Sequence, residues 1–157
     1  TFNHKDNRAN NYKKNYTGRF YELLGEGLTV HKNYPTAVLA AVIFIPLDGC
    51  FDSTERSPSS FGSLVKQFSQ IGGRSSINDP YVQFEFVFIA VHNNDGGIYF
   101  FDAMCKPPWH GEPIEAERIQ TLQLINAITS MVYDRSEHRK RACFSTQDKF
   151  QWSDRED

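Results

Sequence analysis

The stretch AVLAAVIFIPL, residues 37–47, decides the fold class of this 157-residue chain. It is short, continuous and rich in β-branched residues, which is typical of a strand buried on both faces of a helix-covered sheet. The run is far too short to cross a bilayer, which takes about 20 apolar residues, so we expect no membrane segment. The sequence therefore predicts a central strand at residues 37–47.

Helical patterns lie on both sides of this strand. Apolar residues recur at helical spacing within Tyr12–His31, and Asn33–Pro35 ends the pattern because a residue that precedes proline disfavours the α conformation. A second helix is predicted at Ser59–Ile71, with Ser57 or Ser59 as its N-cap and a glycine pair as its stop.

The second half of the chain predicts a hairpin and a long helix. Tyr81–His92 alternates between two faces, Asn93–Gly97 favours a hairpin turn, and Ile98–Met104 returns antiparallel. A helix is expected from Pro113 through Tyr133. Its predicted core face consists of Ile119, Leu122, Ile125, Ile128, Thr129 and Val132.

Together these elements predict an α/β fold with a mixed central sheet flanked by helices, in the order α-β-α-β-β-α. The hairpin is expected toward an edge of the sheet. Residues 1–134 are expected to form a single domain, and residues 135–157 a basic and then polar tail. Because the chain begins at Thr1 without a methionine, an additional N-terminal segment is allowed for.

Composition excludes several classes of protein. With 39% hydrophobic and 23% charged residues and a net charge of −2, the chain is neither disordered nor a coiled coil nor collagen-like. Its three widely spaced cysteines favour a reducing compartment and hence a cytoplasmic protein. Residues 1–15 and 135–141 each hold four basic side chains and one acidic one, which indicates either an anionic partner such as nucleic acid or two solvated ends.

Common catalytic motifs are absent: we find no P-loop, Gly-x-Gly-x-x-Gly, His-Glu-x-x-His, Cys-x-x-Cys or Gly-x-Ser-x-Gly. Cys105, with Asp102, His110 and His92 near it in sequence or across the hairpin, is a candidate thiol nucleophile. The alternative is that Cys105 is a small buried hydrophobic residue.

Carboxylates next to strands are candidate Mg²⁺ ligands. They are Asp48, Asp52, Glu85 and Asp102. The interpretation that we favour assigns Asp48 and Asp52 to turn geometry and Glu85 to a solvent-facing position, with no metal ligand. His31 is interpreted as a helix-end cap rather than a ligand.

The order of the predicted elements and the local composition of the first 130 residues resemble those of a known family. The polar run Lys5–Asn15, the helix that contains Arg19–Leu23, the segment Tyr34–Val38 and the buried strand through Pro46 resemble the second half of a PD-(D/E)XK restriction-endonuclease-like domain. Later parts fit the same resemblance: Ser60 and Phe61 opening a helix, the Phe84–Val91 strand and the Ile98–Asp102 return.

The resemblance implies DNA contact and, in an intact enzyme, Mg²⁺-dependent phosphodiester hydrolysis. The chain contains no Glu-x-Lys or Asp-x-Lys, so the catalytic strand would end upstream of Thr1 and no catalytic residue is carried over. The residues that the resemblance places against phosphate are Lys5, Arg8, Asn11, Lys14 and Arg19.

Two functional hypotheses follow. The first is the DNA-interacting part of a nuclease-like protein, with a homodimer or an upstream segment completing it. The alternative is a non-catalytic protein-binding or assembly module. The aromatic content of 14% favours the alternative, and Phe100, Phe101 and Trp109 are its candidate surface patch.

Overall fold

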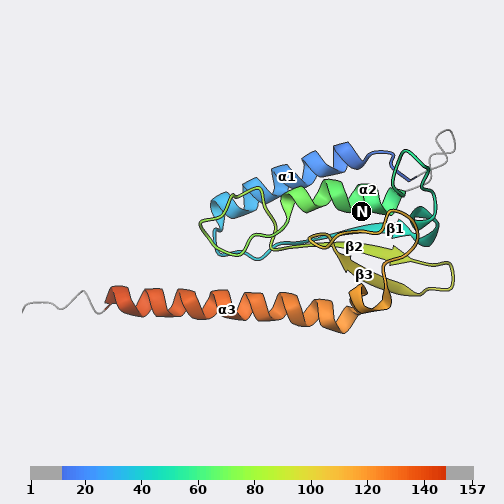
Figure 1. Ribbon diagram of the computed structural model, residues 1–157. Coiled ribbons are helices and arrows are strands. Elements are labelled where there is room, and N and C mark those ends of the chain that lie inside the picture. The colour runs from blue at the N-terminus through green and yellow to red at the C-terminus, as the bar shows by residue number, and fades with distance from the viewer. Residues whose placement is uncertain (1–11, 148–157) are drawn as a thin grey trace, which may run out of the picture.

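The computed structural model describes the backbone of residues 12–147 and the side chains of residues 12–137. Two helices, α1 and α2, cover one face of a sheet, and α3 lies on the other face (Figure 1). The predicted α/β class with a mixed sheet and helices on its faces is confirmed. Along the chain the elements are α1 (Tyr16–Asn33), β1 (Ala40–Pro46), α2 (Ser60–Phe68), β2 (Phe86–His92), β3 (Ile98–Asp102) and α3 (Thr121–Gln147), with 3-10 helices at Leu47–Cys50, Ser69–Ile71 and Glu115–Glu117.

The sheet of the described residues has three strands in the order β1-β2-β3. β1 runs parallel to β2, with Ala40 opposite Phe86, and β3 runs antiparallel to β2. The predicted hairpin joins β2 to β3, and Gly96 has the positive φ of 88° that such a turn requires.

β1 lies at an edge of this sheet, so the prediction that residues 37–47 form the central strand is wrong; β2 is central. The physical reason is that apolar composition reports whether the two faces of a strand are covered, and it does not report whether both backbone edges are paired. Ala41, Ile43 and Ile45 point toward α1 and α2 and are buried, whereas Val42 is only half-buried on the opposite face.

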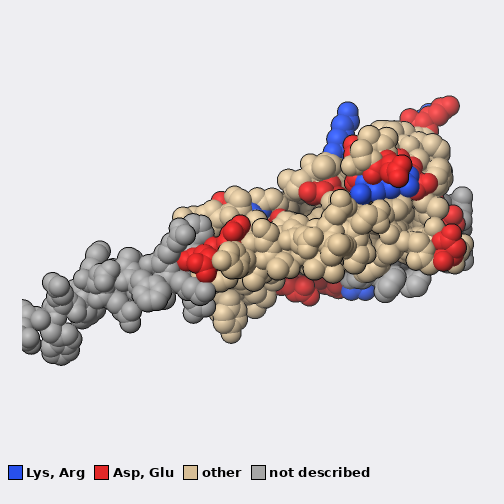
Figure 2. All heavy atoms as spheres, turned by 90° about the horizontal axis from the view of Figure 1, so that it is seen from below, with Lys and Arg blue, Asp and Glu red and all other residues tan. Residues whose placement is uncertain are grey.

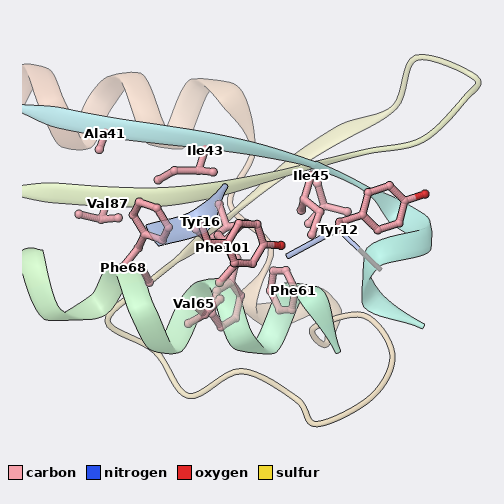
Figure 3. Close-up of a cluster of buried hydrophobic side chains, with 14 of the residues drawn as sticks. Tyr12, Tyr16, Ala41, Ile43, Ile45, Phe61, Val65, Phe68, Val87 and Phe101 are labelled. Atoms are coloured by element: carbon pink, nitrogen blue, oxygen red, sulfur yellow. The ribbon is translucent and has the colours of Figure 1, made fainter. Parts of the chain in front are cut away.

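Two apolar cores lie on the two faces of the sheet. The larger core fills the space between the sheet and the α1–α2 layer, and Figure 3 shows its aromatic rings pointing into that layer from both sides. Within it, the rings of Phe61 on α2 and Phe101 on β3 meet edge to face with centroids 5.3 Å apart. The smaller core consists of Phe88, Ala90, Phe100 and Leu124, the last of them on α3.

Helix boundaries differ from the predictions at several ends. α2 is capped by Ser59, whose side chain accepts a hydrogen bond from the Gly62 amide, so this alternative of the predicted cap is confirmed. α3 begins at Thr121, after Ile119 has paired with Phe100 as an isolated β-bridge. It continues through Gln147, so residues 135–147, expected in a tail, are helical.

The face of α3 that points to the sheet also differs from the prediction. Leu124 and Arg135 are buried and Ile128 is half-buried, whereas Leu122 and Ile125 are 69% and 50% exposed. The prediction of which face of α3 is buried is therefore mostly wrong. Of the predicted residues on this helix, Ile128 is the one that packs against the sheet. The helix carries two apolar stripes, and periodicity alone does not say which stripe meets the sheet.

Candidate functional site

A groove with a volume of about 720 Å³ lies between α1 and the outer edge of β1. Leu23 and Val30 of α1 form one wall, and Leu39 through Val42 form the other. The groove surface is mainly apolar, and Glu22 and Glu26 lie on its α1 side. Among the residues that the structure describes, no Lys, Arg or His lines the groove.

Backbone groups of β1 face this groove. The Phe86 amide donates to the Leu39 carbonyl at 3.2 Å, and Ala40 is the register partner of Phe86. In a parallel ladder the pairing repeats every two residues, so the backbone groups of Leu39 and Ala41 point to β2. The N–H and C=O groups of Ala40 and Val42 therefore point away from β2, toward the open edge.

α1 presents an unusually bare surface at the same place. Gly25 lines the groove, and a Cβ atom added to it would meet no heavy atom within 4 Å. Gly18, seven residues earlier, has the same open surroundings. Gly27 is different, because a Cβ there would lie 3.0 Å from the Phe84 ring and 3.1 Å from a backbone carbonyl. Close packing within the domain thus explains Gly27 but neither Gly25 nor Gly18.

A buried ionic cluster fixes the segments next to the groove. The Glu85 carboxylate accepts hydrogen bonds from Arg74 Nη1 at 3.0 Å and from the Leu39 amide at 2.7 Å, and it forms an ion pair with Arg135 Nη1 at 2.6 Å. The side chains of Glu85 and Arg74 are completely buried. The same carboxylate thus ties the loop before β2, the segment before β1 and α3 together.

This cluster corrects two interpretations. Glu85 does not face solvent, because two guanidinium groups and a backbone amide surround it. His31 is not a helix-end cap: it is fully buried, its Nδ1 lies 3.0 Å from the Tyr81 carbonyl and its Nε2 lies 3.4 Å from Glu85 Oε2. Because a carbonyl only accepts, Nδ1 carries the proton in that contact.

The other candidate metal ligands do not gather. Asp52 accepts from the Ser60 amide at 2.6 Å and so holds the start of α2, and Asp102 accepts from the Met104 amide at 2.8 Å. Asp48 opens the 3-10 helix that follows β1. Within the described part of the chain, no group of three or more His, Cys, Asp or Glu side chains could hold a metal ion.

Of the residues predicted to contact phosphate, some lie outside the described part of the chain and the others lie near the start of α1. Lys5, Arg8 and Asn11 lie outside the described residues. Lys14 is exposed just before α1. Arg19 is exposed, and its guanidinium donates to the Glu22 carboxylate at 2.6 Å. The structure therefore places one exposed lysine and one neutralised arginine at the amino end of α1.

The cysteine hypothesis loses its electrostatic basis. Cys105 is exposed, so the alternative that it is a small buried residue is wrong. Partial desolvation raises the pKa of its thiol, and the charges of Asp102 and Glu117 raise that pKa further. A nucleophilic thiol needs the opposite shift. The Nδ1 atom of His110 lies 2.7 Å from Ser53 Oγ.

The predicted aromatic patch is largely interior. Phe101 is buried in the larger core and Phe100 in the smaller one, while Trp109 is 55% exposed and donates through Nε1 to the Thr54 carbonyl. Exposed apolar side chains gather instead along α3, at Leu122, Ile125, Val132 and Tyr133. The α3 side of the molecule carries few charged side chains across its middle (Figure 2).

Sequence reasoning missed the groove residues altogether. Two small helix-breaking residues seven positions apart, Gly18 and Gly25, were the available indication, since each weakens α1. Within residues 12–147, no helix has the length and apolar character needed to span a membrane. No protein-family model, curated protein or solved structure matches this chain.

Proposed function

We propose that this chain is a protein-binding module that accepts an extended segment of a partner along the open edge of β1. The observation that carries the proposal is the pair of outward backbone groups of Ala40 and Val42 beside an apolar groove. Strand addition of this kind uses main-chain hydrogen bonds for affinity and side-chain pockets for specificity.

The character of the edge supports this proposal. Proteins commonly protect edge strands with charges, bulges or prolines, because an open edge pairs readily with another chain. β1 has the sequence AAVIFIP, which contains no charged residue and has proline only at its last position. Its pairing with β2 is continuous from Ala40 to Pro46, without a bulge. Within the described part of the chain, no strand pairs with Ala40 and Val42 on the side away from β2, and this supports a surface that a partner covers.

The test is a selection from a display library of random eight-residue peptides, with the full chain as bait. We expect wild-type protein to enrich peptides with alternating apolar residues. The matched variant is Ala40→Pro, which removes an outward N–H at the first residue of an edge strand, a position where proline is tolerated. Circular dichroism and thermal unfolding check that the variant folds. If wild-type protein neither enriches peptides nor forms dimers through this edge, or if Ala40→Pro enriches the same peptides, the proposed function is wrong.

DNA contact, as part of a restriction-endonuclease-like protein, is the second candidate, and the exposed Lys14 is the observation that favours it. Any Mg²⁺-dependent hydrolysis would depend on carboxylates contributed from outside the described residues. Removing one phosphate contact lowers the slope of log K against log[salt] by about 1. We therefore expect Lys14→Ala to flatten that slope for duplex DNA of any sequence, and an unchanged slope counts against this candidate.

A further inference from the structure

We infer that the segment that occupies the α1–β1 groove is a basic strand: an extended piece of a partner protein whose apolar side chains enter the groove and whose Lys or Arg pairs with Glu26. This inference rests on the proposed strand addition and adds the chemistry of the partner. It uses the backbone of β1, the bare surface of α1 and the charge of the groove, each of which is a separate observation.

The backbone indicates what kind of molecule fits. Ala40 and Val42 present donors and acceptors in alternation along one line, at the repeat of a β-ladder. An extended polypeptide offers the complementary groups at the same spacing. The groove beside them, lined by Leu23, Val30 and Leu39, receives the side chains on one face of such a strand.

The surface of α1 indicates how closely the partner approaches. Glycine in a helix interior lowers helix stability, and its lack of a side chain lets another backbone or group come near. Gly25 lines the groove and has open space where its Cβ would be. A bound strand under this part of α1 would occupy that space, which gives Gly25 a role that the domain by itself does not give it.

Charge then selects among strands. Glu22 is paired with Arg19, but Glu26 is exposed and makes no ion pair with any described residue. Because none of the described basic side chains lines the groove, we assign the cation to the occupant. A second copy of this chain does not supply it through its own edge, since Leu39–Pro46 contains no Lys, Arg or His. We therefore assign the groove to a strand of another protein that carries a basic residue.

The sequences selected from the peptide library test this inference directly. We expect peptides enriched by the wild-type chain to share Lys or Arg at one fixed position between apolar residues. Glu26→Lys should reverse the preference at that position to Asp or Glu. Glu55→Lys is the matched control, because it makes the same change of charge at an exposed loop position away from the groove residues, and it should leave the basic preference intact.

A second measurement gives the size of the effect. One selected peptide is titrated against wild-type protein and Glu26→Gln, and we expect an affinity loss of about 2–5-fold, the range of a partly exposed ion pair. The same titrations are repeated with a peptide in which alanine replaces the basic residue. If this peptide loses as much affinity for wild-type protein as the original peptide loses for Glu26→Gln, and if the alanine peptide binds Glu26→Gln no more weakly than it binds wild-type protein, the basic residue contacts Glu26.

The outcomes separate the inference from the proposed function. Enrichment that depends on Ala40 but shows no basic position, or that is unaffected by Glu26→Lys, refutes the basic strand and leaves strand addition standing. Concentration-dependent dimers that Ala40→Pro abolishes, without peptide enrichment, assign the groove to a second copy and also refute the inference. Absence of both enrichment and dimers overturns the proposed function itself.

Discussion

Replacing Glu85 by glutamine should destabilise the domain more than any other single change of charge that we consider. Glu85→Gln keeps the shape of the side chain and removes the carboxylate charge that faces two guanidinium groups, those of Arg74 and Arg135. Removing one partner of a buried ion pair costs about 3–5 kcal/mol, because the remaining charge stays desolvated. That is a large part of the roughly 5–15 kcal/mol that holds a typical domain folded.

Urea and thermal unfolding followed by circular dichroism measure this loss. For a chain of this size each kcal/mol corresponds to about 2–4 °C, so we expect the melting temperature to fall by roughly 6–20 °C. Glu22→Gln is the matched control, since Glu22 also lies 2.6 Å from a guanidinium but its side chain is 58% exposed. An exposed pair of this kind contributes about 0–1 kcal/mol.

The geometry of the cluster also predicts which of two variants, Arg135→Met or Glu85→Gln, destabilises the domain more. Arg135→Met leaves one carboxylate, that of Glu85, facing one guanidinium, that of Arg74, so the charges that remain buried cancel. It should therefore cost less than Glu85→Gln. If Glu85→Gln loses less than about 1 kcal/mol, or no more than the Glu22 control, the assignment of a buried ionic cluster is refuted.

Two other predictions concern α1 and the core. Gly25→Ala should stabilise the chain by about 1 kcal/mol, because alanine has the higher helix propensity. Gly27→Ala should destabilise it, because the added Cβ would lie 3.0 Å from a ring carbon of Phe84. Urea unfolding compares the two variants, and equal effects would contradict the packing described for α1. Burial, with the charge of Glu112 next, raises the pKa of the Cys50 thiol from 9.0 to about 12, so between these values the folded protein keeps a proton that the unfolded chain has lost. The contribution of this thiol to the free energy of unfolding should therefore be fully present below pH 9 and should be lost as the pH rises toward 12. Cys50→Ala should make the melting temperature less sensitive to pH between these values.

The sequence predicted the class of fold because local patterns determine it. Continuous apolar residues in 37–47 and alternation in 81–92 predicted two strands, and Asn93–Gly97 predicted the turn between β2 and β3. The lateral order of the strands was beyond these patterns. β1 is apolar because helices cover its faces, and that coverage is the same for an edge strand as for a central one.

The polar interior was harder to predict for a different reason. Glu85 precedes a strand and alternates with apolar neighbours, which is also how a solvent-facing residue looks. Its burial depends on Arg74 and Arg135, which are 11 and 50 positions away along the chain. The groove has the same difficulty, since α1 and β1 form it jointly and Glu26 is unremarkable in isolation.

The contact between Arg135 and the Ala37 carbonyl, 2.7 Å long, has a consequence for biosynthesis, because it joins residues 98 positions apart. At about 5–20 residues per second, a ribosome needs roughly 5–20 s to synthesise the intervening chain. Throughout that interval Glu85, once made, lacks one of its two guanidinium partners, and the sheet face that α3 covers has no helix on it. We therefore expect the nascent domain to complete its folding only after α3 has left the ribosome, and the apolar edge of β1 to be available to chaperones until then.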